Sequence, residues 1–419
     1  MSVLAVSLVA CADDGDDRRF ATDDRPTFVA GSPTPGPTLT PRPTATPATP
    51  AASPESLLVP AGGASSFAFV LGGELWLADP AANVVAAVPG QFPGEILAFD
   101  QHGPSGAAAM VLSDTDTVSL VVIDATGEVR RGTPDLAATL RDVAPGARPV
   151  SIDWSAAADR LLLATVGGGV LDLPLSGPPG VLLAPGLVPF PVEARWDPAG
   201  KVVAVVARDA ADGPARLYVV KPRGGATDLV AVAPSGRDPG RSVVAVEWVA
   251  PGDTLVYLEG ITGGAGSGQD LFAIRPSGAG RSLLATAGQI APAAGVTAVR
   301  PSPGGAAVAF TIHEPDAEGP GFNTLWVRSV GSETLVEVPL ADGETLVSFG
   351  WTAAGLVWQT VPLAAEGQLA GGARLYVMGS DLQPRPFGDV PAPGATPDAS
   401  PDASPAASAV ASPPPPPPA

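Results

Sequence analysis

Apolar and polar positions follow one order that repeats about seven times between Glu55 and Asp389. Each copy predicts an apolar strand, a tight turn, a second apolar strand, a loop and a third strand that begins with leucine. These leucines lie 45 to 54 residues apart, at Leu75, Leu120, Leu171, Leu217, Leu271, Leu325 and Leu375. A period of this length indicates an array of similar supersecondary units that stack against one another.

The copy in the middle of the array shows its strands most clearly. Val192–Trp196 alternates in the manner of a half-buried strand. Asp197–Gly200 then combines proline with glycine, which favours a turn. Lys201–Ala207 is almost entirely valine and alanine, as expected of a strand that is buried on both faces. After a loop, Arg216–Val220 and Asp228–Val232 complete a unit of four strands.

A four-stranded sheet with two apolar faces is stable only when both faces are covered. Stacking each sheet between two neighbours and closing the array into a ring covers every face. We therefore predict an all-β fold, a seven-bladed β-propeller over residues 55–389 with about 48 residues per blade. Six or eight blades are alternatives because the first and last copies are degraded, and a β-sandwich, the runner-up, does not predict this period. The first blade is expected to use Leu57–Val59, Phe67–Val70, Leu75–Ala78 and Val84–Val88.

The turn after the first strand recurs in several copies, at Trp154–Ala157, Trp248–Asp253, Pro301–Gly304 and Trp351–Gly355. Together with the apolar strand and the Leu-Tyr strand that follow it, this turn resembles the TolB-type family of propeller repeats and, more loosely, WD repeats. Those families carry a Trp-Ser-Pro-Asp-Gly-like turn at this place. The resemblance covers most of residues 55–389 and implies a propeller, but it does not imply an activity.

The first residues indicate export. Met1–Ala10 is short and apolar, and Leu8-Val9-Ala10-Cys11 resembles the lipobox of bacterial lipoproteins. The resemblance implies a signal peptide over residues 1–10 and a lipid on Cys11. That lipid would anchor the protein in the cell membrane, facing the extracytoplasmic side at the cell surface or in the periplasm. More than one acyl chain gives stable anchoring, whereas a single chain binds only marginally.

Two further segments lie outside the repeats. Residues 11–54 are acidic at first and then rich in proline and threonine, which favours an extended, semi-rigid linker. Residues 390–419 consist mostly of proline, alanine, serine and aspartate, and we expect a disordered tail because so little apolar surface can be buried there. The propeller therefore stands between a lipid-anchored linker and a disordered tail.

Charge limits the partners. The net charge is -19, from 42 acidic and 23 basic residues, and we find no basic stripe, so nucleic acid is disfavoured. Cys11 is the single cysteine, which excludes a disulfide within the chain. We expect a monomer that contacts the membrane through its lipid and binds a protein, a peptide or a glycan.

The sequence offers few groups for catalysis. His102 and His313 are the only histidines, and no Gly-x-Ser-x-Gly motif occurs. His313-Glu314-Pro315-Asp316 supplies one nitrogen and two carboxylates without the spacing of a metal site, so a solvated loop is the preferred interpretation. The recurrent tryptophans at the ends of the first strands are expected to serve packing. We predict no catalytic residue, no metal site and no cofactor.

Loop lengths predict where a partner would bind. In a propeller blade, the loops after the second and fourth strands share one face, and here several of them are long and rich in glycine and acidic residues. Loops on a rigid scaffold commonly carry function. The candidate interaction face consists of Asp209, Asp212, Glu259, Glu314, Asp316, Glu318 and Glu366.

These observations favour a lipid-anchored, extracytoplasmic propeller that binds a protein, a peptide or a glycan without catalysis. One alternative is a propeller glycosidase or lyase that uses loop carboxylates across the central opening. Two acidic residues that face each other there, with pKa values pushed apart, would favour it. The other alternative is a structural component of envelope assembly.

Overall fold

The computed structural model describes residues 64–71, 74–88, 92, 94–114, 117–124, 128–131, 135–188, 190–223, 226–233, 241–261, 269–286, 288, 290, 294–314, 322–363, 372–379 and 381–390. Cys11, the predicted linker, the tail after Val390 and the predicted strand Leu57–Val59 lie outside these residues.

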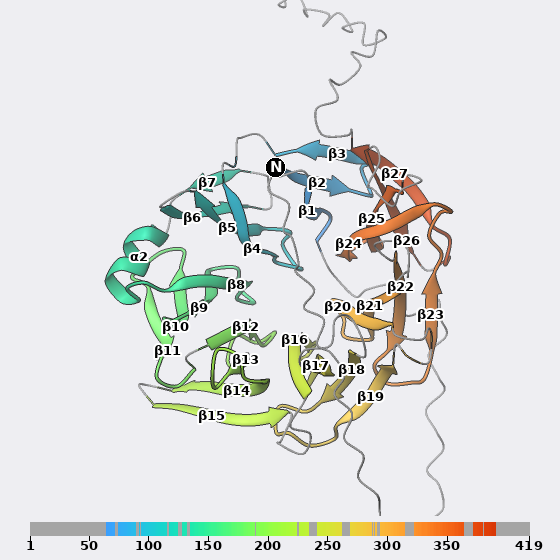
Figure 1. Cartoon of the computed structure of the whole chain (residues 1–419). Helices are drawn as coiled ribbons and strands as arrows, with labels where there is room; N and C mark the ends of the chain where they lie inside the picture. Colours follow the sequence, from blue (N-terminus) through green and yellow to red (C-terminus); the bar gives the residue numbers. More distant parts are fainter. Residues whose placement is uncertain are drawn as a thin grey trace, which may run out of the picture. The chain divides into compact units, whose positions relative to one another are not determined.

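Seven antiparallel sheets follow one another along the chain and surround a common centre (Figure 1), which confirms the predicted seven-bladed β-propeller. Blade one has three described strands: β1 (Phe67–Leu71), β2 (Glu74–Asp79) and β3 (Val84–Ala87). Blade two consists of β4 (Glu95–Gln101), β5 (Ala108–Asp114), β6 (Thr117–Ile123) and β7 (Val129–Arg131). Blade three consists of β8 (Arg148–Trp154), β9 (Arg160–Val166), β10 (Gly169–Pro174) and β11 (Gly180–Leu183).

The other four blades have the same order of strands. Blade four consists of β12 (Phe190–Trp196), β13 (Val203–Arg208), β14 (Ala215–Arg223) and β15 (Ala226–Ala233), close to the four strands predicted from the sequence. Blade five consists of β16 (Arg241–Val249), β17 (Thr254–Ile261), β18 (Asp270–Ile274) and β19 (Ser282–Thr286). Blade six consists of β20 (Gly295–Pro301), β21 (Ala307–Glu314), β22 (Phe322–Ser329) and β23 (Leu335–Val338). Blade seven consists of β24 (Glu344–Thr352), β25 (Gly355–Pro362), β26 (Ala373–Met378) and β27 (Arg385–Val390).

The first strand of blades two to seven carries a β-bulge at one equivalent position. The extra residue is Leu97, Val150, Val192, Val244, Thr297 or Val347. A bulge bends its strand and redirects the side chains that follow it. The position three residues after each bulge lies near the propeller axis, and it forms the site described below.

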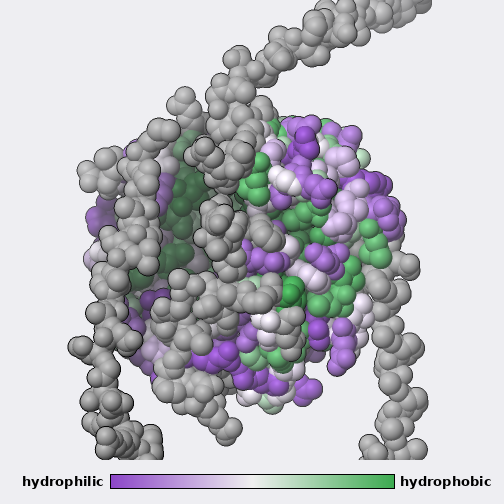
Figure 2. Space-filling model, turned by 45° about the vertical axis from the view of Figure 1, so that its right-hand side comes forward, coloured by the Kyte–Doolittle hydropathy of each residue, from purple (hydrophilic) through white to green (hydrophobic). Residues whose placement is uncertain are grey.

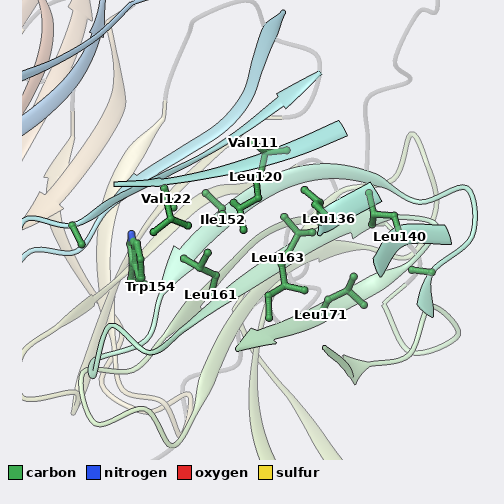
Figure 3. Close-up of a cluster of buried hydrophobic side chains, with 14 residues drawn as sticks. Val111, Leu120, Val122, Leu136, Leu140, Ile152, Trp154, Leu161, Leu163 and Leu171 are labelled. Carbon is green, nitrogen blue, oxygen red and sulfur yellow. The ribbon is translucent and has the colours of Figure 1, made fainter. Parts of the chain in front are cut away.

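The hydrophobic core lies between successive blades. Figure 3 shows one such cluster, in which Val111 and Leu120 of blade two pack with Ile152, Leu163 and other residues of blade three. The second strands are buried on both faces because each one contacts both neighbouring blades. Burial of this kind accounts for the valine, leucine and alanine runs that the sequence shows there.

One helix, α2 (Leu136–Val143), interrupts the strands between blades two and three. Asp135 caps its N-terminus, where the side chain accepts a hydrogen bond from the Ala138 amide at 3.0 Å. Leu136 and Leu140 pack into the cluster of Figure 3, so the helix covers the edge of that junction. The repeat pattern did not predict this helix.

The surface mixes hydrophilic and apolar residues on the face drawn in Figure 2. Val84, Val181, Leu283 and Leu335, which are large exposed apolar residues, belong to the outermost strands β3, β11, β19 and β23. Within the described ranges, no helix is long and apolar enough to cross a membrane.

Candidate binding site on the propeller axis

A cavity of about 570 Å³ lies on the propeller axis and is lined by residues from all seven blades. Most of the lining comes from the ends of the first strands and from the turns that follow them, such as His102–Pro104 and Asp197–Pro198. The cavity therefore lies toward the face of the short turns. Its volume is within the range of small-molecule and peptide pockets.

Charged side chains occupy one equivalent position in five consecutive blades. The residue three positions after the bulge is Asp100, Asp153, Arg195, Glu247 or Arg300 in blades two to six. All five line the cavity. Blades two to six therefore form a charged wall, in which opposite charges alternate from Asp153 onward.

Arg195 is the centre of this wall. Its Nη1 lies 3.2 Å from Asp153 Oδ1 and 3.4 Å from Asp100 Oδ1. Its Nη2 lies 2.6 Å from Glu193 Oε1 and 3.5 Å from Glu247 Oε1. The Arg195 side chain is only 9% exposed, so these contacts are little screened by water.

The carboxylates also join neighbouring blades through the backbone. Asp100 of blade two accepts a hydrogen bond from the Trp154 amide of blade three at 3.2 Å. Asp153 accepts one from the Trp196 amide of blade four at 2.6 Å. Inner strands have no sheet neighbour toward the axis, so these carboxylates satisfy amides that would otherwise be unpaired. The charged wall thus stabilises the ring in addition to lining the cavity.

Two tryptophans join blades in a second way. Trp248 Nε1 donates to the Arg195 carbonyl of the preceding blade at 3.1 Å, and Trp351 Nε1 donates to the Arg300 carbonyl at 2.9 Å. Both side chains are buried in the core clusters between blades. The predicted packing role is confirmed, although both residues also line the cavity.

Burial changes the proton affinity of the wall. It raises the pKa of Asp100 to about 6, although the Arg195 guanidinium acts in the opposite direction. Burial and the neighbouring Asp100 raise the pKa of Asp153 well above its usual range. Burial alone would lower the pKa of Arg195, but four neighbouring carboxylates together raise it well above its usual value.

The opposite wall of the cavity is apolar. Blade seven has Gly350 where blades two to six have a charged residue, and a Cβ there would lie 2.7 Å from the Phe67 ring. Phe67 stacks on Phe69, with ring centroids 5.7 Å apart. Phe349 and Trp351 extend this wall. The cavity therefore combines an aromatic side with a charged side.

His102 lies at the cavity rim and is 8% exposed. Its Nδ1 lies 2.7 Å from Ser105 Oγ and accepts a hydrogen bond from the Ser105 amide at 3.2 Å, which places the proton of the neutral ring on Nε2. Burial lowers the pKa of His102, and the Ala156 backbone opposes that effect. The ring packs against Trp154, with centroids 6.2 Å apart. His102 is thus a neutral hydrogen-bonding group beside the cavity.

A second, smaller cavity of about 260 Å³ lies along the same inner strands. Three bulge residues, Val150, Val192 and Val244, contribute to its lining. Arg195 and Phe99 line both cavities.

Four of the predicted acidic loop residues are described by the structure, and these four do not line the axial cavity: Asp209, Asp212, Glu259 and Glu314. Asp209 and Asp212 belong to the loop between β13 and β14, and Glu314 ends β21. Asp209 contacts Arg216 at 3.3 Å and Tyr218 at 3.2 Å, while Asp212 is exposed. Asp316, Glu318 and Glu366 lie outside the described residues.

Glu259 is placed differently from the other loop candidates. It belongs to β17, its side chain is 2% exposed, and it pairs with Arg281 at 2.8 Å and Arg241 at 3.6 Å. Arg281 also donates to the Tyr257 hydroxyl at 2.7 Å and lies over the Phe272 ring. Glu259 therefore links the inner strand β16 with the residue before β19 inside blade five and does not present a free carboxylate.

Sequence reasoning missed the charged wall. The signal is visible as a charged residue directly before the tryptophan in Asp153-Trp154, Arg195-Trp196 and Glu247-Trp248. From strand alternation alone, one can tell only on which face of its sheet this residue lies. The five positions of the charged wall come together because of the bulges and the closure of the ring. In the part of the chain that the structure describes, no three His, Cys, Asp or Glu side chains form a group that could hold a metal ion.

Comparisons with known proteins identify the fold alone. No protein-family model and no curated protein matches the sequence. Among solved structures, the tricorn protease is similar at 12% identity with a TM-score of 0.51, and the match covers 80% of this chain and 35% of that one. This chain thus spans about a third of the tricorn protease chain.

Two TolB structures are also similar. TolB from Acinetobacter baumannii has 13% identity and a TM-score of 0.43, with 78% of this chain and 79% of that one covered. The putative TolB from Agrobacterium tumefaciens has 15% identity and a TM-score of 0.40, with 58% and 81% covered.

Proposed function

We propose that this protein is a non-catalytic binding module whose ligand, a protein, a peptide or a glycan, enters the axial cavity. The observation that carries the proposal is the composition of that cavity. It has an aromatic wall around Phe67 and Trp351 and a charged wall around Arg195. Apolar surface with a few well-positioned polar groups is the usual composition of a ligand pocket.

The contacts of the carboxylates favour binding over catalysis. Asp100 and Asp153 each accept a backbone amide of the next blade and contact Arg195. A general acid or base must exchange its proton with the substrate, and such contacts tie these oxygens to the scaffold instead. They suit a rigid recognition surface, which loses little entropy when a ligand binds.

A cavity-filling variant tests the site. Gly103 lines the cavity, and a Cβ at this position would meet no atom within 4 Å. Gly103→Trp should therefore fill the entrance without distorting the fold. Gly331 also has open space around it but does not line the cavity, so Gly331→Trp is the matched control.

The assay uses the full chain on peptide and glycan arrays. We expect the ligands that bind the wild-type chain to bind the Gly331→Trp variant and to be lost with Gly103→Trp. If Gly103→Trp retained all of these ligands, the axial cavity would not be the binding site. In that case the predicted loop face around Asp209 and Asp212 would be the surface to test next.

A second candidate function is favoured by one observation. Two carboxylates with raised pKa values, Asp100 and Asp153, line the same cavity. Perturbed carboxylates in a cavity are typical of glycoside hydrolases and lyases. Turnover of a polysaccharide panel that is abolished by Asp100→Asn or Asp153→Asn, with folding intact, would establish an enzyme and refute the binding module.

We also propose that the protein acts as a monomer on the extracytoplasmic side of a cell membrane, anchored by a lipid on Cys11. The support is the lipobox-like Leu8-Val9-Ala10-Cys11. In the native host, the protein should partition into the detergent phase of Triton X-114, and Cys11→Ser should move it to the aqueous phase. Equal partitioning of the two forms would refute the anchor.

A further inference from the structure

Among the residues that the structure describes, β1 of blade one has no strand paired to its inner edge, and this edge faces the axial cavity. Its sheet has the order β1-β2-β3, whereas each of the other six sheets has four strands. Leu75 and Leu171 are equivalent leucines of the repeat. Val70 of β1 pairs with Leu75, and Leu163 of the second strand of blade three pairs with Leu171, so β1 corresponds to the second strands of the other blades. Within the described ranges, no strand occupies the innermost position of blade one, and Phe67–Val70 line the cavity directly.

The Gln101 side chain covers part of this edge. Its Oε1 accepts a hydrogen bond from the Ala68 amide at 2.9 Å, and its Nε2 donates to the Ser66 carbonyl at 3.0 Å. The amide group thus imitates one residue of a neighbouring strand. Because backbone groups alternate sides along a strand, the N–H and C=O of Val70 point the same way as those of Ala68. Among the described residues, Val70 is therefore the position of this edge that has no partner strand.

A segment paired at this edge has a defined path. In blade three, Ile152 pairs with Leu163, the equivalent of Val70, and Asp153 pairs with Leu162, the equivalent of Phe69. The residue opposite Phe69 would thus take the position that Asp153 has in its own blade. That position lies beside the charged wall.

The charged wall favours a cation there. Four carboxylates, those of Asp100, Asp153, Glu193 and Glu247, share two guanidinium groups, Arg195 and Arg300. The cluster therefore carries an excess of negative charge when all its carboxylates are ionised. A lysine or arginine side chain brought to this place would offset that charge in a partly buried environment.

We propose that an extended peptide segment with a lysine or arginine side chain binds in the axial cavity by adding a fourth strand to blade one, paired with β1 at Val70. This inference rests on the proposed function and specifies its ligand class. Main-chain hydrogen bonds to a strand edge provide affinity, and alternate side chains provide specificity. Residues 55–61 of the chain itself precede β1, but they contain no lysine or arginine, so charge favours a separate partner.

Fluorescence anisotropy with synthetic peptides and the full chain tests the inference. The probe is a labelled seven-residue peptide of alternating valine and threonine with a central lysine. In one control, norleucine replaces the lysine. In the other, the residue next to the lysine, which would pair with Val70, is N-methylated. We expect the norleucine peptide to bind at least tenfold more weakly and the N-methylated peptide to lose binding, because it cannot donate to the Val70 carbonyl.

Gly103→Trp should lower the affinity of the chain for the lysine peptide at least tenfold, and Gly331→Trp should leave this affinity unchanged. Equal binding of the lysine peptide and either control peptide would overturn the proposal. Binding of a peptide with the sequence of residues 55–61 as tightly as the lysine peptide would overturn it too, in favour of the protein's own segment. If only glycans bound, and Gly103→Trp abolished that binding, the peptide proposal would fail while the proposed function stood.

Discussion

Replacing Arg195 by methionine should destabilise the propeller strongly at neutral pH. The side chain is 9% exposed and contacts four carboxylates from blades two to five, so its removal leaves several buried negative charges without their common partner. Removing one partner of a buried ion pair costs about 3–5 kcal/mol. We expect Arg195→Met to lower the free energy of unfolding by about this amount.

Arg300 provides the matched control, because it has the same position in blade six. Its side chain is 47% exposed and forms one ion pair, with Glu247. Exposed pairs contribute about 0–1 kcal/mol, so Arg300→Met should cost no more than that. Both variants lose one positive charge. The difference between their losses of stability therefore reports the effect of burial and of the number of ion-pair partners.

The cost of Arg195→Met should also depend on pH. Because the pKa of Asp100 is about 6, most of this carboxyl is protonated at pH 5, and Asp153 has a raised pKa as well. Fewer buried charges then need Arg195, so the difference from wild type should be smaller at pH 5 than at pH 8. Urea unfolding followed by tryptophan fluorescence measures both values. The reasoning would be refuted if Arg195→Met and Arg300→Met lowered the free energy of unfolding equally, or if the effect of Arg195→Met did not depend on pH.

Three other variants test separate parts of the structure. Burial raises the pKa of Asp100 from 3.8 to about 6, so the folded state binds this proton more tightly, and stability should fall by about 2 kcal/mol between pH 4 and 6. Asp100→Asn should flatten that fall in urea titrations. Gln101→Ala should cost about 1–3 kcal/mol and speed hydrogen exchange at the Ala68 amide, unlike the exposed Gln383→Ala. Gly305 has φ +72° and no room for a Cβ beside the Ala250 carbonyl, so Gly305→Ala should lower Tm, whereas Gly331→Ala should not.

Much of the fold could be predicted because its physical cause is local. The second strands are buried on both faces, so they read as runs of valine, leucine and alanine, and the turns between first and second strands contain the expected proline and glycine. The period of the leucines then gives the number of blades. Helix α2 was missed because its eight residues make little more than two turns, which is too short for a helical period to stand out between two strands.

The candidate site could not be predicted in the same way. Arg195 reads in the sequence as one charge among the polar positions of a half-buried strand. Its contact with Asp100 joins residues 95 positions apart, and it depends on the bulges that turn equivalent positions toward the axis. The long loops are visible in the sequence, and they led to the prediction of an interaction face on the side of the propeller opposite the short turns. The function of that face stays a prediction.

Hydrogen–deuterium exchange of the full chain, with and without saturating lysine peptide, tests most directly whether the axial cavity receives the ligand. The account predicts slower exchange at β1, above all at Val70, and unchanged exchange in residues 209–214 between β13 and β14. Protection of that loop, with no change at β1, would contradict it.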